Sequence, residues 1–264
     1  MRIAVVLPMY NEADNVAPLM ERLAVVRERA GLDLVALAVN DGSRDATAQR
    51  LTDARRQYAF VRAVDHSRNR GLAAALRTGI ATALSDRNPE FDALAFMDAD
   101  LTHAPEDLPR LLAPILEDRA DFVLGSRYVP GGGMRGVPLA RRAISVVGNA
   151  AARWMLGVRA ADLTSGFRAG RAAVYRAITL HETGFGIQLE ATVKAQRTGF
   201  RVAEVPITLG VRKHGYSKMA YTRSFWLGYA RLLIKLTCAR RVVDLPASNL
   251  HAEAEDAQSR GAAL

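Results

Sequence analysis

The N-terminal half of the chain repeats one pattern, in which a short apolar run is followed by a polar loop and then by apolar residues at helical spacing. The apolar runs are residues 3–7, 34–39, 61–64, 94–97 and 122–124. Strands that alternate with helices through short connections predict a mostly parallel sheet with right-handed crossovers. We therefore expect a Rossmann-like α/β fold, with a twisted sheet flanked by helices and with the polar loops gathered along one edge.

Acidic residues stand in these loops, directly after the predicted strands. Asp98 and Asp100 follow the run 94–97, and Glu12 and Asp41 follow the first two runs, with Asn69 in the loop after the third. An isolated Asp-x-Asp is more often a solvated turn, but four acids at one edge repel one another unless a ligand engages them. Carboxylates suit Mg²⁺ or Mn²⁺, which commonly complete their coordination with substrate phosphates. The acids together predict a metal-assisted nucleoside diphosphate site.

The charge of the chain points to an anionic partner. The 264 residues carry a net charge of +9, and residues 197–241 hold ten Lys or Arg against the single acid Glu204. A membrane surface, a phosphorylated substrate or a nucleic acid would each match this charge. Nucleic acid is disfavoured because the sequence has no nucleic-acid-binding motif. Cys238 is the single cysteine, which excludes an intramolecular disulfide and favours a reducing, cytosolic compartment.

The C-terminal part differs in character from the rest. Residues 221–237 form a predicted amphipathic helix with Arg223, Arg231 and Lys235 on one side, and it either packs on its own domain or lies in a membrane interface. We expect a catalytic domain over residues 1–220, this basic helix over 221–246 and a disordered tail over 247–264. We expect neither a signal peptide nor a membrane-spanning stretch, so the protein is predicted to be soluble or peripheral.

Six segments in a fixed order resemble those of a known enzyme family. They are residues 8–12 (Pro-Met-Tyr-Asn-Glu), 40–43 (Asn-Asp-Gly-Ser), 68–71 (Arg-Asn-Arg-Gly), 98–100 (Asp-Ala-Asp), 162–168 (Asp-Leu-Thr-Ser-Gly-Phe-Arg) and 212–218 (Arg-Lys-His-Gly-Tyr-Ser-Lys). Together they resemble the family 2 inverting glycosyltransferases of GT-A fold, in particular the dolichol-phosphate mannosyltransferases and the bacterial polyprenyl-phosphate glycosyltransferases. The resemblance covers about residues 1–220.

The resemblance implies a role for each motif residue. The donor nucleotide is expected to contact Pro8, Tyr10, Glu12, Asp41, Asn69, Asp98, Arg212, Ser217 and Lys218. The acceptor phosphate is expected to contact Arg127, Arg141, Arg142 and Ser145. The residues expected to act most directly in catalysis are Asp100, Arg127, Arg212 and Lys218. The expected cofactor is Mg²⁺ or Mn²⁺ on Asp98 and Asp100, with Thr102 at a position where relatives commonly have a glutamine, which leaves the metal preference open.

The function implied is transfer of mannose or glucose from GDP-mannose or UDP-glucose to a polyprenyl phosphate, at the cytoplasmic face of the membrane. A phosphate monoester has a second pKa of about 6, so the acceptor is already an anion and needs positioning rather than a general base. One alternative is a soluble acceptor, whose hydroxyl would require a base such as Glu190. Another is a non-catalytic subunit that binds sugar nucleotides. The histidines, His66 and His103 among them, are expected to be isolated surface or structural residues rather than catalytic ones, and the oligomeric state is not indicated.

Overall fold

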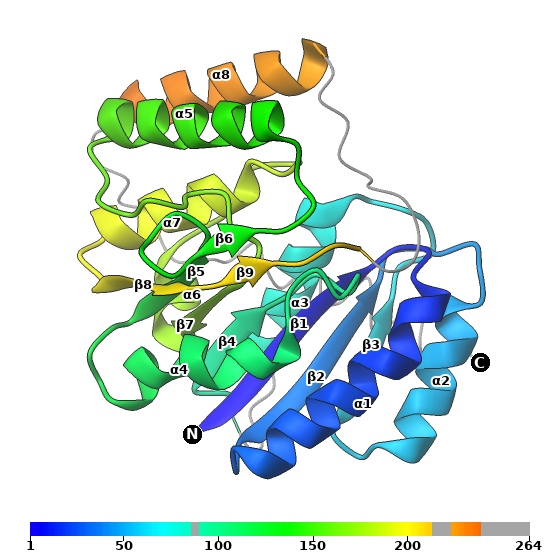
Figure 1. Ribbon diagram of the computed structural model, residues 1–264. Helices are drawn as coiled ribbons and strands as arrows, with labels where there is room; N and C mark the ends of the chain where they lie inside the picture. The colour runs from blue at the N-terminus through cyan, green and yellow to red at the C-terminus, as the bar shows by residue number, and fades with distance from the viewer. Residues whose placement is uncertain (86–89, 213–222, 239–264) are drawn as a thin grey trace.

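Within residues 1–85, 90–212 and 223–238, which the computed structural model describes, seven strands form one sheet in the order β3-β2-β1-β4-β7-β5-β8 (Figure 1). Its strands are β1 (Arg2–Met9), β2 (Asp33–Asn40), β3 (Val61–Asp65), β4 (Ala93–Phe96), β5 (Phe122–Ser126), β7 (Arg168–Arg171) and β8 (Val202–Pro206). The neighbours β3-β2-β1-β4 are parallel, as are β5 and β8. The predicted α/β class with a mostly parallel sheet is confirmed.

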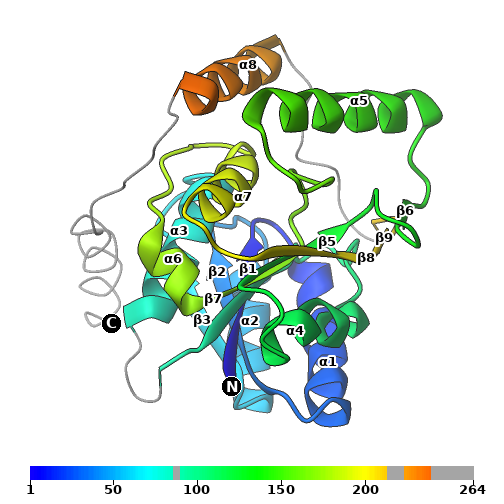
Figure 2. The same ribbon diagram turned by 90° about the vertical axis from the view of Figure 1, so that its left-hand side faces the viewer.

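Helices cover both faces of the sheet (Figure 2). One face packs on α1 (Ala13–Arg29), α2 (Thr47–Gln57) and α4 (Leu108–Leu116). The other face packs on α3 (Leu72–Ser85), α6 (Ala172–Ala177) and α7 (Ile187–Arg197). A 3₁₀ turn at Pro105–Asp107 precedes α4. Strand β1 shows why helices must cover both faces of the sheet. Ile3 and Val5 belong to the first core, whereas Ala4 and Val6 belong to the second. Because successive side chains of a strand point to opposite faces, a continuous apolar run requires two covering layers.

Helix α3 lies unusually close to the sheet at Gly79. A β-carbon at Gly79 would lie 2.3 Å from Cγ1 of Val6. The alanine-rich helix therefore approaches β1 closely, and the glycine that interrupts its helical pattern has a packing reason. This contact places the N-terminus of α3, and with it the loop 66–71, at the carboxyl ends of β1 and β2.

The sheet contains a strand that the sequence pattern did not indicate. Strand β7 runs antiparallel to β4 on one side and β5 on the other. Its sequence, Arg-Ala-Gly-Arg, is short and lacks an apolar run, so its strand character depends on its neighbours. After β8 the chain forms a separate short strand, β9 (Thr208–Leu209), which pairs in parallel with β6 (Gly133–Met134).

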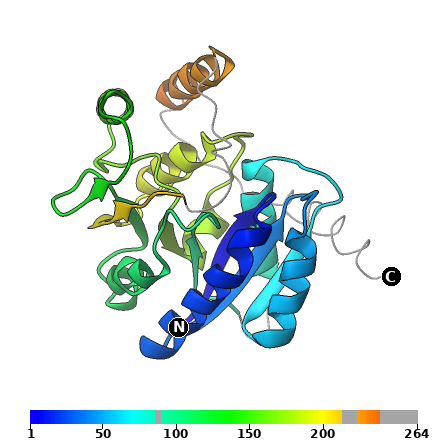
Figure 3. The same ribbon diagram turned by 45° about the vertical axis from the view of Figure 1, so that its right-hand side comes forward.

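Helices α5 (Leu139–Leu156) and α8 (Arg223–Cys238) form an outer layer beyond α7 (Figures 1 and 3). Helix α8 packs through Leu232 and Leu236, which share a core with Ala152 and Leu156 of α5. The predicted C-terminal helix is therefore present over 223–238. The rest of the expected range 221–246 and the expected tail 247–264 lie outside the described residues. No helix among the residues described here is both long and apolar enough to cross a bilayer.

Candidate active site

The loops that follow β1, β2, β3 and β4 meet at one edge of the sheet, as the parallel pairing requires. Met9 pairs with Asn40, and Asn40 pairs with Asp65, so these three strands end at one level. The backbone N–H of Asp41 donates to the carbonyl of Met9 at 2.7 Å. This register brings Glu12, Asp41 and the Asp98-Ala99-Asp100 segment to the same edge.

A tight turn holds Asp100. The backbone N–H and the hydroxyl of Thr102 both donate to Oδ1 of Asp100, at 3.0 and 2.6 Å. Leu101 between them has a φ of 61°, a left-handed conformation that is uncommon for leucine. Strained backbone of this kind is often found at functional sites. Thr102 therefore positions Asp100, and its hydroxyl proton is engaged by that carboxylate.

Arg212 lies against two of the edge carboxylates. Its Nη2 is 2.5 Å from Oδ2 of Asp100, and its Nη1 is 3.5 Å from Oε1 of Glu12. The segment before Arg212 is tied to the same turn, because the N–H of Gly210 donates to the carbonyl of Thr102 at 2.7 Å. Nη1 is buried and makes no hydrogen bond among the described residues, so apart from its ion pair with Glu12 its donor capacity is unused there.

Asp98 lies beside Asp100 in a different environment. Burial raises the pKa of its carboxyl, as does the neighbouring charge of Asp100, whereas the positive charges of Arg212 and Arg168 act in the opposite direction. Its side chain nevertheless keeps 41% exposure. The N–H of Asp98 donates to Nδ1 of His103 at 3.3 Å, and the His103 ring stacks on Phe167 with 5.3 Å between centroids. His103 is therefore a buried positioning residue for this loop.

Asp41 is largely engaged by the protein itself. Its carboxylate accepts hydrogen bonds from the N–H groups of Arg70 and Gly71, both at 2.8 Å, and Nδ1 of His66 lies 2.7 Å from Oδ1. Nε2 of His66 is in turn 2.9 Å from the hydroxyl of Thr78. A carboxylate offers about four acceptor positions. Three are taken, so Asp41 anchors the loop 66–71 and keeps limited capacity for a ligand.

Glu12, another residue expected to contact the donor nucleotide, is held by hydrogen bonds of its own. The N–H of Glu12 donates to the hydroxyl of Thr47 at 2.9 Å, and its carboxylate accepts from the amide of Asn15 at 2.6 Å. Asn69 is exposed, and Tyr10 is partly buried. Asn69 and Arg68 pass so close to Gly42 that a β-carbon there would lie 2.2 Å from the carbonyl carbon of Arg68.

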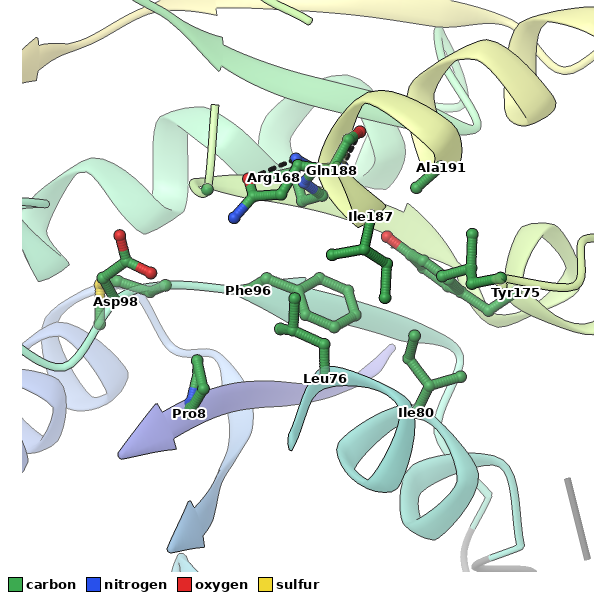
Figure 4. A pocket seen from close by; sticks show the side chains of 13 residues that line it. Pro8, Leu76, Ile80, Phe96, Asp98, Arg168, Tyr175, Ile187, Gln188 and Ala191 are labelled. Atoms are coloured by element: carbon green, nitrogen blue, oxygen red, sulfur yellow. Dashed lines mark hydrogen bonds between the residues drawn. The ribbon is translucent and has the colours of Figure 1, made fainter. Parts of the chain in front are cut away.

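A pocket opens beside Asp98, between the sheet and helices α3 and α7 (Figure 4). Its walls include Pro8 and apolar side chains such as Leu76, Ile80 and Ile187, and its polar groups include Arg168 and Gln188. Arg168 donates to the carbonyl and to the side-chain oxygen of Gln188, at 2.7 and 2.6 Å. Burial lowers the pKa of Arg168 to about 10, so it remains a cation at neutral pH. The pocket is therefore lined mainly by apolar side chains, with Asp98, Arg168 and Gln188 as polar groups.

Arg127 is fixed by a buried carboxylate on the far side of the loop 162–168. Its Nε and Nη2 donate to the two oxygens of Asp162, both at 2.7 Å, and Nη2 also donates to Thr164 at 3.0 Å. Asp162 is fully buried. The next residue, Tyr128, has its hydroxyl 2.6 Å from the hydroxyl of Ser145 on α5. Tyr128 thus links the segment that carries Arg127 to Ser145 of α5, and the expected roles of Arg127 and Ser145 at the acceptor phosphate stay predictions.

The loop 162–168 contacts both Arg127 and the Asp98–Asp100 segment. Asp162 and Thr164 hold Arg127, whereas a β-carbon at Gly166 would lie 3.2 Å from the carboxylate of Asp98. Thr164 and Gly166 are two residues apart, so their backbones lie within about 7 Å of each other. The Arg127 group and the Asp98 group are therefore neighbours in space.

Three expected site residues lie wholly or partly outside what the structure describes. Ser217 and Lys218 fall in residues 213–222, and the side chain of Arg141 is likewise not described. Arg142 lies in the first turn of α5 and is exposed. Their roles stay predictions.

Sequence reasoning missed the partners that hold the site residues. Asp162, Tyr128 and the Arg168–Gln188 pair were not assigned roles, and His66 was expected to be isolated although it is buried against Asp41. The signal for Asp162 was its place at the start of the motif 162–168.

Glu190, the base considered for a soluble acceptor, has a structural position. It is buried, and its carboxylate accepts hydrogen bonds from the N–H groups of His181 and Glu182, so it stabilises a loop.

The donor atoms at the edge fit a divalent cation that shares its coordination with a substrate. Among the described residues no cluster of three or more His, Cys, Asp or Glu is arranged to hold a metal. Asp98 and Asp100 supply a carboxylate pair, and Arg212 already lies on Asp100, which shows that the position favours positive charge. Mg²⁺ and Mn²⁺ accept such incomplete protein shells when phosphate oxygens and water complete them.

Residues 4–182 match the family described as Glycosyl transferase family 2. The match spans most of the chain, and the chain therefore belongs to glycosyltransferase family 2. It is an enzyme of the glycosyltransferase class, and its sheet and helices have the GT-A arrangement that the motifs predicted.

Three curated relatives are similar over most of this chain. The undecaprenyl-phosphate mannosyltransferase of Micrococcus luteus is 37% identical over 83% of this chain and 88% of its own length. The polyprenol monophosphomannose synthase of Mycolicibacterium smegmatis is 37% identical over 83% of this chain and 81% of its own. The dolichol-phosphate mannosyltransferase of Pyrococcus furiosus is 33% identical, over 83% of this chain and 59% of its own length.

Solved structures with the same fold include glucosyl-3-phosphoglycerate synthase from Mycobacterium tuberculosis. Its complex with phosphoglyceric acid has a TM-score of 0.64 and 21% identity, over 94% of this chain and 81% of that one. Its complex with Mn²⁺, UDP and glucosyl-3-phosphoglycerate has a TM-score of 0.62, also at 21% identity and over 94% and 81% of the two chains. At this identity the likeness establishes the fold.

Proposed function

We propose that this enzyme transfers a hexose, mannose or glucose, from GDP-mannose or UDP-glucose to a polyprenyl phosphate with inversion at the anomeric carbon. The observation that carries the proposal is the adjacency of two differently charged groups. The carboxylate of Asp98 lies against Gly166 of the loop 162–168, with Asp100 two residues further along, and the guanidinium of Arg127 is fixed by Asp162 and Thr164 of the same loop. One group suits a metal-bound leaving diphosphate, and the other suits an incoming phosphate. The relatives that carry prenyl-phosphate mannosyltransferase names support the same acceptor.

The reaction needs no protein base. An oxygen of the acceptor phosphate attacks the anomeric carbon, a new carbon–oxygen bond forms, and the bond to the nucleoside diphosphate breaks on the opposite face. The acceptor is already ionised near neutral pH, since its second pKa is about 6. A divalent metal held by Asp98 and Asp100 would offset the charge that develops on the departing diphosphate. Metal dependence is part of this proposal.

The chain's own residues would supply position and charge. Arg127 presents a guanidinium whose orientation is set by Asp162 and Thr164, which favours a phosphate at a defined place. Arg141, Arg142 and Ser145 on α5 would complete the acceptor site. Pro8, Tyr10, Glu12, Asp41 and Asn69 would surround the nucleoside, with Asp41 acting mainly by holding the loop 66–71. Arg212, Ser217 and Lys218 would face the diphosphate, and Thr102 would orient Asp100.

The buried state of Glu190 also weighs against a soluble sugar acceptor. A hydroxyl nucleophile requires a base, and the Glu190 carboxylate is already engaged by two backbone N–H groups and lies 3.2 Å from Lys194. The phosphoglycerate ligand of the M. tuberculosis synthase belongs to a protein of the same fold at 21% identity. It therefore identifies a soluble phosphate acceptor as the comparison substrate for the assay below.

The direct test is transfer of radiolabelled hexose. Full-length protein is incubated with Mn²⁺, GDP-mannose or UDP-glucose, and a short polyprenyl phosphate, and the organic-soluble product is counted. We expect labelled lipid with one donor and loss of labelling when the metal is chelated. Label in an added phosphoglycerate or free sugar, with none in the lipid under either donor, would contradict the prenyl acceptor. Lipid labelling that survives chelation would contradict the metal.

We also propose a peripheral position at the cytoplasmic face of the membrane, and the outer helices support the contact with the membrane. Helix α5 exposes apolar side chains, among them Trp154 with 86% exposure, and α8 exposes Leu227 and Ile234 while it buries Leu232 and Leu236. The C-terminal helix was expected either to pack on its own domain or to lie in a membrane interface. We propose that it does both, with one side packed on the protein and the other side available to lipid. An exposed apolar surface near basic residues is suited to a lipid interface.

We therefore assign residues 1–220 to the GT-A domain, 221–246 to an interfacial basic helix and 247–264 to a disordered tail, as a proposal for domain organisation. Co-sedimentation with anionic vesicles tests it. Trp154→Ser is expected to weaken vesicle binding, whereas Leu116→Ser, a change at an exposed leucine of α4, is expected to leave binding unchanged. Equal binding by wild type and Trp154→Ser would argue against the α5 surface.

A further inference from the structure

Arg197, the last residue of α7, contacts the C-terminal ends of both outer helices. Its Nη2 donates to the carbonyl of Leu156, the last residue of α5, at 3.1 Å, and its Nη1 donates to the carbonyl of Leu236 near the end of α8. One side chain thus bridges three helices. The C-terminal ends of α5, α7 and α8 lie toward the same side of the molecule in Figure 1.

The chemistry of these contacts is favourable and specific to arginine. The last four carbonyl groups of a helix have no intrahelical partner, and a cation near them also interacts well with the helix dipole. A guanidinium has five donors in a fixed planar fork, so it can serve two carbonyl groups at once. A lysine ammonium is a point charge without this geometry. Partial burial also lowers the pKa of Arg197, because desolvation disfavours its charge, and it remains protonated at neutral pH.

Helix α7 connects this bridge to the candidate active site. Ile187 and Gln188 at the start of α7 line the pocket beside Asp98, and Arg197 ends the helix about 15 Å from Ile187 at 1.5 Å per residue. At the other end of the arrangement, α5 bears Ser145, and Asn149 of α5 accepts a hydrogen bond from the N–H of Leu163 at 2.9 Å. The helix that would carry acceptor residues is therefore held to the catalytic half by these hydrogen bonds and by the packing of Ala152 and Leu156.

We propose that Arg197 is a positioning residue for the acceptor: it fixes α5 and α8 relative to α7 and so sets the affinity for the lipid phosphate. The inference rests on the proposed function, in which Arg142 and Ser145 of α5 contact that phosphate. Helix α8 has a further attachment, because Lys235 lies 3.6 Å from Glu182 and Leu232 packs where a β-carbon at Gly186 would be. Loss of Arg197 therefore loosens the outer layer without detaching it.

The test compares Arg197→Met with Arg201→Met. Methionine keeps an unbranched side chain and removes every donor. Arg201 is a matched control, since the same change removes its ion pairs with Asp118 and Asp121 at a distance from α5 and α8. For Arg197→Met we expect the KM for a short polyprenyl phosphate to rise about tenfold, with kcat and the KM for the nucleotide sugar nearly unchanged. Arg201→Met is expected to leave all three constants as in wild type.

Amide hydrogen exchange on the substrate-free protein gives a readout that does not depend on the reaction. In Arg197→Met we expect faster exchange in α5 and α8 and unchanged exchange in β1 and α1. An unchanged acceptor KM, or a parallel loss of kcat, donor affinity and thermal stability, would overturn the positioning role. If wild type does not label polyprenyl phosphate, the proposed function fails. Unchanged exchange in α5 and α8 would still separately overturn the bridge.

Discussion

Arg212 and Asp100 form an ion pair in which Nη2 of the arginine lies 2.5 Å from Oδ2 of the aspartate. The contact joins the segment after β9 to the loop after β4, and the Gly210–Thr102 backbone hydrogen bond holds these two segments together. The same guanidinium approaches Glu12. Two acids that follow different strands thus share one cation, and the pair connects the proposed metal-binding carboxylate to the proposed diphosphate-binding arginine.

Replacement of Asp100 by asparagine tests the carboxylate directly. Asp100→Asn keeps the shape of the side chain and the acceptor for Thr102, but it removes the charge that would bind the metal. We expect kcat to fall at least about a hundredfold with the fold retained, since electrostatic stabilisation of a leaving group is worth several kcal/mol. Asp107→Asn, at an acid in the following 3₁₀ turn, is the control and should keep full activity. Turnover by Asp100→Asn at the wild-type rate would exclude the metal role.

Removal of Arg212 should have opposite effects on metal binding and on transfer. Arg212→Ala removes a positive charge that competes with a divalent cation for Asp100. We expect Mn²⁺ to bind the nucleotide-free variant about tenfold more tightly, as measured by electron paramagnetic resonance of free Mn²⁺. Transfer should nevertheless decrease, because a donor to the diphosphate is lost. Arg22→Ala, which breaks an exposed ion pair with Glu106, is the control. Weaker Mn²⁺ binding by Arg212→Ala than by this control would refute the competition.

The guanidinium fork of Arg127 should be needed for the acceptor. Arg127→Lys retains a charge that can pair with Asp162, so the protein should fold, but it loses the paired donors that orient the side chain. We expect the KM for polyprenyl phosphate to rise about tenfold while the KM for the nucleotide sugar changes little. Arg119→Lys, at an exposed pair with Glu117, serves as the matched substitution. A rise confined to the donor KM would assign Arg127 to the other substrate.

Two glycines with similar backbone angles should differ in their tolerance of alanine. Gly31 has a φ of +60° and nothing within 4 Å of the place that a β-carbon would take, whereas Gly42 has a φ of +65° and the backbone of Arg68 at 2.2 Å from that place. Gly31→Ala should lower the free energy of unfolding by about 1 kcal/mol, from backbone strain alone. Gly42→Ala should cost clearly more in chemical denaturation, because the loop 68–71 must move. An equal loss of unfolding free energy in the two variants would mean that the loop 68–71 can move aside at little energetic cost.

Acidification should weaken the ion-pair cluster of Asp118, Asp121 and Arg201, which lies just before β5 and β8. Hydrogen bonds from Arg201 lower the pKa of Asp121 and of Asp118 in the folded protein. At a pH near the pKa of these two carboxyls, the folded form therefore binds fewer protons than the unfolded form. The stabilising contribution is complete above about pH 4 and is lost as pH falls through the folded pKa.

The comparison of wild type with Arg201→Met measures this contribution. Denaturant midpoints taken between about pH 7 and pH 3 should converge at the acid end, since protonation removes the same interaction as the substitution. A difference that is constant across the pH range would show that Arg201 acts by packing rather than by charge.

The sequence predicted the parts of the fold that depend on local pattern. Strands β1 to β4 and their crossover helices follow from apolar runs and helical spacing, and the edge acids follow from their place after those runs. Strand β7 did not, because residues 168–171 become a strand through pairing with β4 and β5. Asp41 was predicted to contact the nucleoside, and the structure adds three contacts with His66, Arg70 and Gly71 that no local pattern encodes.

The sequence by itself determined the α/β class, the edge that bears the acids and, through six ordered motifs, the glycosyltransferase family. These features are carried by residue type and spacing along the chain. Tertiary structure alone decided that Arg212 reaches Asp100, that Asp162 orients Arg127 and that Arg197 joins α7 to α5 and α8. The physical reason is that contacts between distant segments depend on strand register, loop path and burial, and periodicity specifies none of these.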